Sequence, residues 1–186
     1  MNFPERYKAD IVSAVESIDL DEIVDVIELF KQTRARGGKI FVCGKTGSAL
    51  TAARVLSDMI MRSSFDRAAR FRILALRDGP PQSDSNRESI SDDRLFVEQL
   101  KNFAEPGDVV VGISASETSP CVLRALEYGA SIRCRTVALT GLEGGRLSNL
   151  ANITIHVGST HVGTVEDTHV VICHMIGSYF LEFDQP

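Results

Sequence analysis

The feature that most constrains the fold is a series of short apolar runs separated by helical stretches. Five of these runs are predicted to be buried strands, over residues 39–43, 71–76, 108–113, 134–139 and 153–157. Strands that are apolar almost throughout are typical of parallel sheets covered by helices on both faces. The sequence therefore predicts a doubly wound α/β fold with a five-stranded parallel sheet.

Two amphipathic helices are predicted before the first strand. Ile11, Val15 and Ile18 mark the apolar stripe of the first, and the second ends at Gly37 and Gly38. A final helix is predicted from about residue 162 to residue 183. With 186 residues the chain can bury a sizeable core, and we expect a single domain over 1–186 with 1–37 as N-terminal helices.

Composition excludes several classes of partner. The chain has 20 Lys and Arg residues and 25 Asp and Glu residues, which gives a net charge of −5. The overall charge therefore attracts neither nucleic acid nor an anionic membrane. The first residues lack an apolar signal core and no run approaches the ~18 residues of a membrane span, so a cytoplasmic protein is expected. The four cysteines are widely spaced, which favours buried, unpaired thiols.

A hydroxyl-rich turn follows the third predicted strand. Between Ser114 and Ser119 there are four side-chain hydroxyls, directly before a predicted helix. Hydroxyls and the first amides of a helix can donate hydrogen bonds to phosphate oxygens, so this turn is a candidate phosphate site. The alternative is an ordinary helix N-cap, for which Ser and Thr are common.

A similar turn, Gly44–Ser48, follows the first predicted strand. It contains Gly-Lys-Thr, which is also found in nucleotide-binding P-loops. A P-loop has another Gly five residues before this Gly, but here that position is Lys39, in the predicted strand. A tight turn that lets backbone amides and the Ser48 hydroxyl approach an anion is the better interpretation.

The two turns are predicted to meet. In the common doubly wound strand order 2-1-3-4-5, strands one and three are neighbours and their C-terminal ends form the point where ligands bind. The turns at residues 44–48 and 114–119 follow these two strands. The sequence therefore predicts one anion site between them.

Four motifs, in order and at similar spacing, resemble the SIS (sugar isomerase) family of phosphosugar-binding domains, and most closely its phosphoheptose isomerases. They are Cys43–Ser48, Gly107–Ser116, Leu139–Gly145 and Val165–His174. The resemblance implies a homotetramer with active sites between subunits, and N-terminal helices that contribute to the interface. It also implies phosphate binding by Ser48, Ser114, Ser116 and Ser119.

The reaction implied by the resemblance interconverts a ketose phosphate and an aldose phosphate through an enediol, with sedoheptulose 7-phosphate as the expected substrate. Such a reaction needs a base beside the carbonyl and a group that moves protons between oxygens. In the family a Glu on the helix after the first turn and a His on the last helix fill these roles, and zinc has been associated with them.

This chain departs from the family pattern on the first of these helices. Arg54 and Asp58 stand where the family has His and Glu, and Glu166 stands where it has Gln, while His174 is retained. We expect Glu166 or Asp58 as the base, His174 as the proton shuttle, and Gly47 and Arg54 among the substrate-binding residues. Arg54 and Asp58, four residues apart, could alternatively form a surface ion pair.

The expected cofactor is none, since the Arg54 guanidinium offers no lone pair to zinc. Asp58, Glu166 and His174 could still form a metal set with two carboxylates and one histidine. The other histidines, His156, His161 and His169, are expected to be ordinary surface or loop residues.

The alternative function is a non-catalytic phosphosugar-binding or regulatory protein, resembling the DnaA initiator-associating protein of the same family. In either case the expected partners are a phosphorylated sugar and further copies of the chain, with no direct contact to nucleic acid or membrane.

Overall fold

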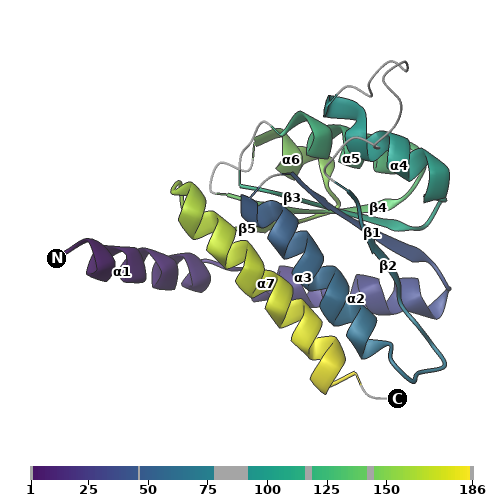
Figure 1. The fold of residues 1–186 in the computed structure, drawn as a ribbon, viewed down its shortest axis with the longest axis horizontal. Helices are drawn as coiled ribbons and strands as arrows, with labels where there is room; N and C mark the ends of the chain where they lie inside the picture. The colour runs from purple at the N-terminus through teal and green to yellow at the C-terminus, as the bar shows by residue number, and fades with distance from the viewer. Residues whose placement is uncertain (1, 46, 78–91, 116–118, 142–144, 185–186) are drawn as a thin grey trace, which may run out of the picture.

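The structure is a computed structural model that describes residues 2–45, 47–77, 92–115, 119–141 and 145–184, except for the side chains of residues 48–50 and 92 (Figure 1). The helices are α1 (Phe3–Glu16), α2 (Leu20–Ala35), α3 (Gly47–Ser63), α4 (Leu95–Phe103), α5 (Pro120–Ser131), α6 (Gly145–Leu150) and α7 (Val162–Glu182), with a short 3-10 turn, η1 (Asp92–Arg94). The predicted N-terminal helix pair and the final helix are therefore confirmed.

The strands form one parallel sheet in the order β2-β1-β3-β4-β5, as predicted. Their bounds are β1 (Lys39–Gly44), β2 (Arg72–Ala75), β3 (Val109–Ser114), β4 (Arg135–Thr140) and β5 (Ile153–His156). Gly44 at the end of β1 is paired with Ile113 of β3, so these two strands end side by side.

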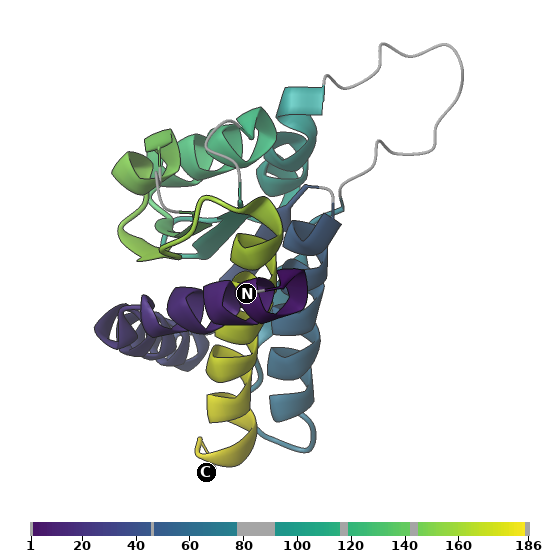
Figure 2. The same cartoon turned by 90° about the vertical axis from the view of Figure 1, so that its left-hand side faces the viewer.

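Helices cover both faces of the sheet (Figures 1 and 2). Val109, Val111 and Ile113 of β3 pack into a core with α2, α3 and α7, whereas Val110 packs into a second core with α4, α5 and α6. Because successive side chains of a strand point to opposite faces, a strand buried on both faces is apolar at every position. This explains the continuous apolar runs in the sequence.

The cysteines follow the prediction. Cys43, Cys121, Cys134 and Cys173 are buried and unpaired, and burial raises the pKa of the Cys173 thiol to about 12. No helix in the described part of the chain is both long enough and apolar enough to cross a bilayer.

Helix α1 stands apart from the α/β body and contacts it through α7 (Figures 1 and 2). Its start is stabilised by a capping box, in which the Asn2 side chain accepts from the Glu5 amide and the Glu5 carboxylate accepts from the Asn2 amide. Tyr7 on this helix donates a hydrogen bond of 2.8 Å to Asp167 of α7. Ala14 is its only buried residue, so most of α1 is left exposed.

Helices α3 and α7 lie side by side and run in the same direction (Figures 1 and 2). Gly47 at the start of α3 lies against Glu166 near the start of α7, and Met59 lies against Gly177 further along both helices. A Cβ atom at Gly177 would come within 2.7 Å of the Met59 Cβ. The absence of a side chain at Gly177 therefore sets the close approach of the two helices.

We predict that Gly177→Ala destabilises the protein, because the Met59 Cβ atom is fixed by its backbone and the helices would have to separate. Overpacking costs about 1–3 kcal/mol and better helix propensity offsets about 1 kcal/mol. Because the contact is with an atom that cannot rotate away, we expect a net loss near the upper end, about 2 kcal/mol, in urea unfolding. Ser178→Ala, the neighbouring position on α7, is the control. Unchanged or higher stability of Gly177→Ala would contradict this account.

Candidate functional site

The predicted meeting of two turns occurs at the C-terminal edge of the sheet. Ser114, the last residue of β3, is buried and pairs with Thr140 of β4, while the paired residue before it, Ile113, adjoins Gly44 of β1. The turns that continue from Gly44 and Ser114 thus start from neighbouring strand ends, which is where open α/β sheets bind ligands.

The hydroxyl-rich turn is described at its two ends. Ser119 is the N-cap residue of α5, but its side chain makes no capping hydrogen bond and its Oγ lies 3.5 Å from the Cys121 Sγ. Ser119 therefore has the position of an N-cap residue, but its hydroxyl does not cap the helix. Ser116 lies outside the described residues and remains a prediction.

The first turn leads directly into α3. Gly47 begins this helix with a φ of +51°, in the left-handed region that favours glycine. The side chain of Ser48 is outside the described part of the chain, so its role as a phosphate ligand remains a prediction.

The carboxylate of Glu166 lies against this turn. Its Oε1 is 3.2 Å from the point that a Cβ atom of Gly47 would occupy, and the side chain is only partly buried. A carboxylate at the start of a helix is stabilised by the positive end of the helix dipole. Of the predicted catalytic side chains, Glu166 is thus brought to the edge where β1 and β3 end.

Asp58 and Arg54 have a different environment. They form an ion pair of 3.7 Å on the surface of α3, with 63% and 81% of their side chains exposed, which confirms the surface ion pair interpretation. Asp58 lies three helical turns beyond Gly47, or about 16 Å along the axis, so it does not share a location with Glu166.

His174 is exposed on α7. It lies eight residues after Glu166 on the same helix, a rise of about 12 Å. It faces away from buried His169, as expected for residues five apart on a helix.

These positions do not fit a metal held by one chain. Asp58, Glu166 and His174 are not gathered together, and the described residues contain no group of three or more His, Cys, Asp or Glu side chains able to hold an ion. Arg54, at the position of a family histidine, supplies no lone pair.

The expectation that His169 is a surface or loop residue was wrong. Its side chain is 1% exposed, and neither ring nitrogen makes a hydrogen bond. Burial lowers the pKa of His169 to about 4, opposed by the nearby backbone carbonyl of Thr140. The signal was present in the helical spacing, since Val165, His169, Ile172 and Ile176 share one face and the other three are buried and apolar.

The two remaining histidines have local structural contacts. His161 is the N-cap of α7, where its Nδ1 accepts a hydrogen bond of 3.2 Å from the Thr164 amide. His156 lies at the end of β5, with its Nδ1 2.8 Å from the hydroxyl of Thr140.

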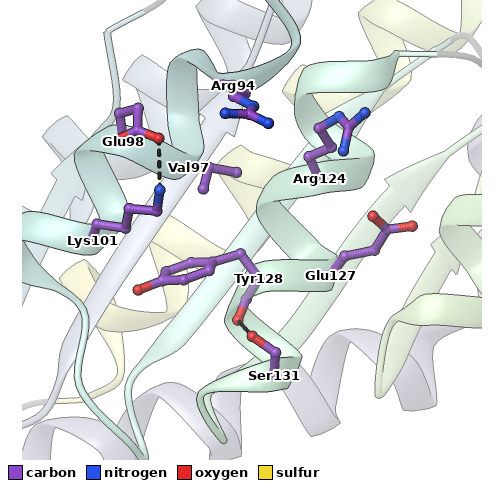
Figure 3. A pocket seen from close by; sticks show the side chains of 8 residues that line it. All are labelled: Arg94, Val97, Glu98, Lys101, Arg124, Glu127, Tyr128 and Ser131. Atoms are coloured by element: carbon purple, nitrogen blue, oxygen red, sulfur yellow. Dashed lines mark hydrogen bonds and ion pairs between the residues drawn. The ribbon is translucent and has the colours of Figure 1, made fainter.

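A surface hollow of about 410 Å³ lies between α4 and α5, on the opposite face of the sheet from α7 (Figure 3). Its charged side chains are largely paired, Lys101 with Glu98 at 2.7 Å and Arg124 with Asp93 at 2.6 Å. It contains none of the predicted site residues. The hollow therefore gives no alternative location for the site.

We predict that His169 makes stability depend on pH. Its pKa is about 4 in the folded protein against an ordinary 6.5, so the unfolded chain binds more protons between these values. Stability is therefore complete above pH 6.5 and falls as the pH drops toward 4, by on the order of 3 kcal/mol from this group. Urea unfolding from pH 7 to pH 4.5 should show a smaller decline for His169→Leu than for the wild type. Parallel profiles would contradict the buried neutral state.

Comparisons with a family model and with related sequences point to the same protein family. Residues 5–141 match the family model described as SIS domain. A probable phosphoheptose isomerase from Thermoplasma volcanium is 33% identical over 169 residues, covering 89% of this chain and 84% of the relative. A phosphoheptose isomerase from Geobacter sp. (strain M21) is 32% identical over 171 residues, covering 92% and 88%.

Solved structures share the fold. Phosphoheptose isomerase GmhA from Neisseria gonorrhoeae matches with a TM-score of 0.79 at 22% identity, covering 96% of this chain and 98% of that one. The NanR protein of Vibrio vulnificus, solved in complex with ManNAc-6P, matches with a TM-score of 0.68 at 14% identity, covering 97% and 62%. With the sheet order, the paired turns and these matches together, the chain belongs to the SIS domain family.

Proposed function

We propose that this protein is an aldose–ketose isomerase that interconverts sedoheptulose 7-phosphate and a heptose 7-phosphate through an enediol. Relatives about 30% identical over most of the chain are named phosphoheptose isomerase, which supports this substrate class. The structural observation that carries the proposal is the Glu166 carboxylate against Gly47, at the edge where β1 and β3 end.

The phosphate is assigned to the hydroxyl-rich turn and the start of α5. A phosphate dianion beside the Glu166 carboxylate would be repelled, so the anionic end of the substrate is better held on the side of Ser114 and Ser119. Ser116, in the same turn, completes this set of hydroxyl donors, whereas Ser48 follows Gly47 on the side of Glu166 and is the weaker candidate. The sugar carbons then extend from this turn toward Glu166.

Glu166 is the preferred base. It removes the proton from the carbon beside the carbonyl and returns it to the neighbouring carbon, while His174 carries a proton from one oxygen to the other. Each group gives up the proton that it takes, so the enzyme is left unchanged at the end of the turnover. Asp58 is the second candidate, but its exposure and its ion pair with Arg54 make it a weaker base for a reaction that must exclude water. In that case Arg54 would contact substrate oxygens.

The separation of Glu166 and His174 supports a site between subunits. They are about 12 Å apart along one helix, and because all side chains of a helix lean in the same direction, their lean does not reduce this separation. The two groups meet more readily on one substrate if His174 comes from a second copy.

Exposed apolar residues support an oligomer, for which we propose the homotetramer implied by the family resemblance. Phe3 and Val12 on α1 are 65% and 48% exposed, and Leu20 and Val24 on α2 are 63% and 59% exposed. Residues 1–37 would therefore form part of the subunit interface, where burial of these side chains is favourable.

The second candidate function is a phosphosugar-binding regulator. It is favoured by the surface location of Asp58, since the family's Glu position would then carry no catalytic group. The shared fold with NanR, a structure holding ManNAc-6P, supports binding of a phosphorylated sugar without deciding between the two functions.

Deuterium exchange separates these functions. Incubation with sedoheptulose 7-phosphate in heavy water should label the carbon beside the carbonyl, and the exchange rate should fall by about 10²–10⁴ in Glu166→Gln and in His174→Ala, the range typical of lost acid–base catalysis. Asp58→Asn should lose less than about ten-fold.

Each of the other outcomes has a defined meaning. A large loss in Asp58→Asn with little effect of Glu166→Gln would reassign the base to Asp58. Binding of the sugar phosphate to the wild type without any exchange would favour the regulator and overturn the isomerase.

We also predict that exchange does not depend on a divalent metal, because Arg54 cannot bind one and no described cluster replaces the missing ligand. Dialysis against EDTA should leave the rate within about two-fold, and elemental analysis of the purified protein should show no stoichiometric zinc. Loss of activity on dialysis, restored by added zinc, would contradict this prediction.

A further inference from the structure

The first turn of α7 is a weak helix start, and it carries the proposed base. Its N-cap residue is His161, which is not among the residue types that cap helices best, and Gly163 in the first turn lowers the helix propensity. Helix ends also open more easily than helix centres, because their first amides lack intrahelical acceptors. Glu166 is the fifth residue of this helix, so contacts that hold this turn also hold Glu166.

The side chain of Tyr7 lies on this turn, although it comes from the other end of the chain. Helix α1 crosses α7 (Figure 2), and the ring of Tyr7 contacts the ring of His161 edge to face, with 5.9 Å between the centroids. The Tyr7 hydroxyl donates a hydrogen bond of 2.8 Å to Asp167. The same hydroxyl is 3.5 Å from the point that a Cβ atom of Gly163 would occupy. The phenol therefore covers the start of α7.

We propose that Tyr7 is a positioning residue for the isomerase reaction, which holds the Asp167 carboxylate toward α1 and thereby keeps the neighbouring Glu166 carboxylate against the turn after β1. The inference rests on the proposed function in one respect, the assignment of the base to Glu166.

The two adjacent carboxylates contact different helices. Gly163, Glu166 and Asp167 are at positions i, i+3 and i+4, so they share one side of α7. On this side Asp167 accepts its hydrogen bond from Tyr7 of α1. The Oε1 atom of Glu166 lies against Gly47, at the start of α3. The first turn of α7 thus directs one carboxylate to α1 and the other to α3.

Repulsion between these carboxylates gives the hydrogen bond its effect. Neighbouring negative charges repel each other. Without a donor on the side of α1, the Asp167 carboxylate is free to rotate toward Glu166 and to push the longer side chain away from Gly47. The hydrogen bond to Asp167 also raises the pKa of the Tyr7 hydroxyl, which therefore stays protonated and remains a donor at physiological pH.

The first experiment compares Tyr7→Phe with the wild type. This variant keeps the ring on His161 and removes only the hydroxyl. Glu166 then loses its fixed position but not its chemistry, so kcat for sedoheptulose 7-phosphate should fall about five- to ten-fold, because small displacements of a reacting group reduce the rate steeply. The KM should change less than about two-fold, since the phosphate is assigned to the turn after β3.

A second variant tests the role of the Asp167 charge. Asp167→Asn replaces the carboxylate by an amide of the same shape that does not repel Glu166. The double variant Tyr7→Phe/Asp167→Asn should therefore recover kcat to within about two-fold of Asp167→Asn alone. A hydroxyl that only tethers α1 predicts no such recovery.

The matched control is Ser17→Ala. Ser17 is the C-cap of α1, about 15 Å from Tyr7 along the axis, and its Oγ accepts a hydrogen bond of 2.7 Å from the Gly158 amide. This variant also removes a contact that anchors α1, but it leaves the start of α7 intact. Its kcat should equal that of the wild type, and light scattering should give the same assembly mass for all variants.

Four results would overturn the proposal. They are a wild-type kcat in Tyr7→Phe, a loss that Asp167→Asn does not reduce, an equal loss in Ser17→Ala, and a loss accompanied by a change in assembly mass. The last two would show that the anchoring of α1, and not the position of Glu166, determines the rate.

Failure of the proposed function is recognised separately, by a wild type without deuterium exchange or by full exchange in Glu166→Gln. The position of Glu166 is then followed by the NMR chemical shift of its carboxyl carbon. This shift should change in Tyr7→Phe and stay the same in Ser17→Ala. An unchanged shift in Tyr7→Phe would overturn the inference about Tyr7 whatever the reaction is.

Discussion

The close packing of α7 on α3 is the contact on which the candidate site depends. These helices come from distant parts of the chain. Because Gly177 has no side chain, the side chain of Met59 can occupy the space beside it and the helices can approach closely. The same approach, at the other end of the pair, brings the Glu166 carboxylate to Gly47. A helix at a greater distance would leave Glu166 exposed and the turn after β1 without an acidic group.

The site has two helix starts that can stabilise negative charge, and their surroundings differ. The start of α3 already has the Glu166 carboxylate beside it, whereas Ser119 at the start of α5 leaves its hydroxyl uncommitted to capping. Because like charges repel, this division would separate the phosphate of the proposed substrate from the proposed base. Arg54 and Asp58, the two residues of α3 that differ from the family pattern, lie at a third location, on the exposed face of this helix.

Much of the fold could be predicted from local pattern. The strands were recognised because burial on both faces makes them continuously apolar, and the observed β4 (Arg135–Thr140) differs from the predicted 134–139 by one residue at each end. The ion pair of Arg54 and Asp58 followed from helical spacing alone. The burial of His169 was not predicted because histidine occurs both on protein surfaces and in cores. Only its position in the apolar stripe of α7 indicated burial.

The sequence by itself determined the succession of helices and strands along the chain, the two hydroxyl-bearing turns and the side chains available for chemistry, because periodicity and turn residues are local properties. Only the tertiary structure decided which acidic group lies at the turns. Glu166 and Asp58 were equal candidates in the sequence, 108 residues apart. The packing of α7 placed one of them against Gly47 and left the other in solvent, since the positions of side chains from distant helices depend on how closely those helices pack.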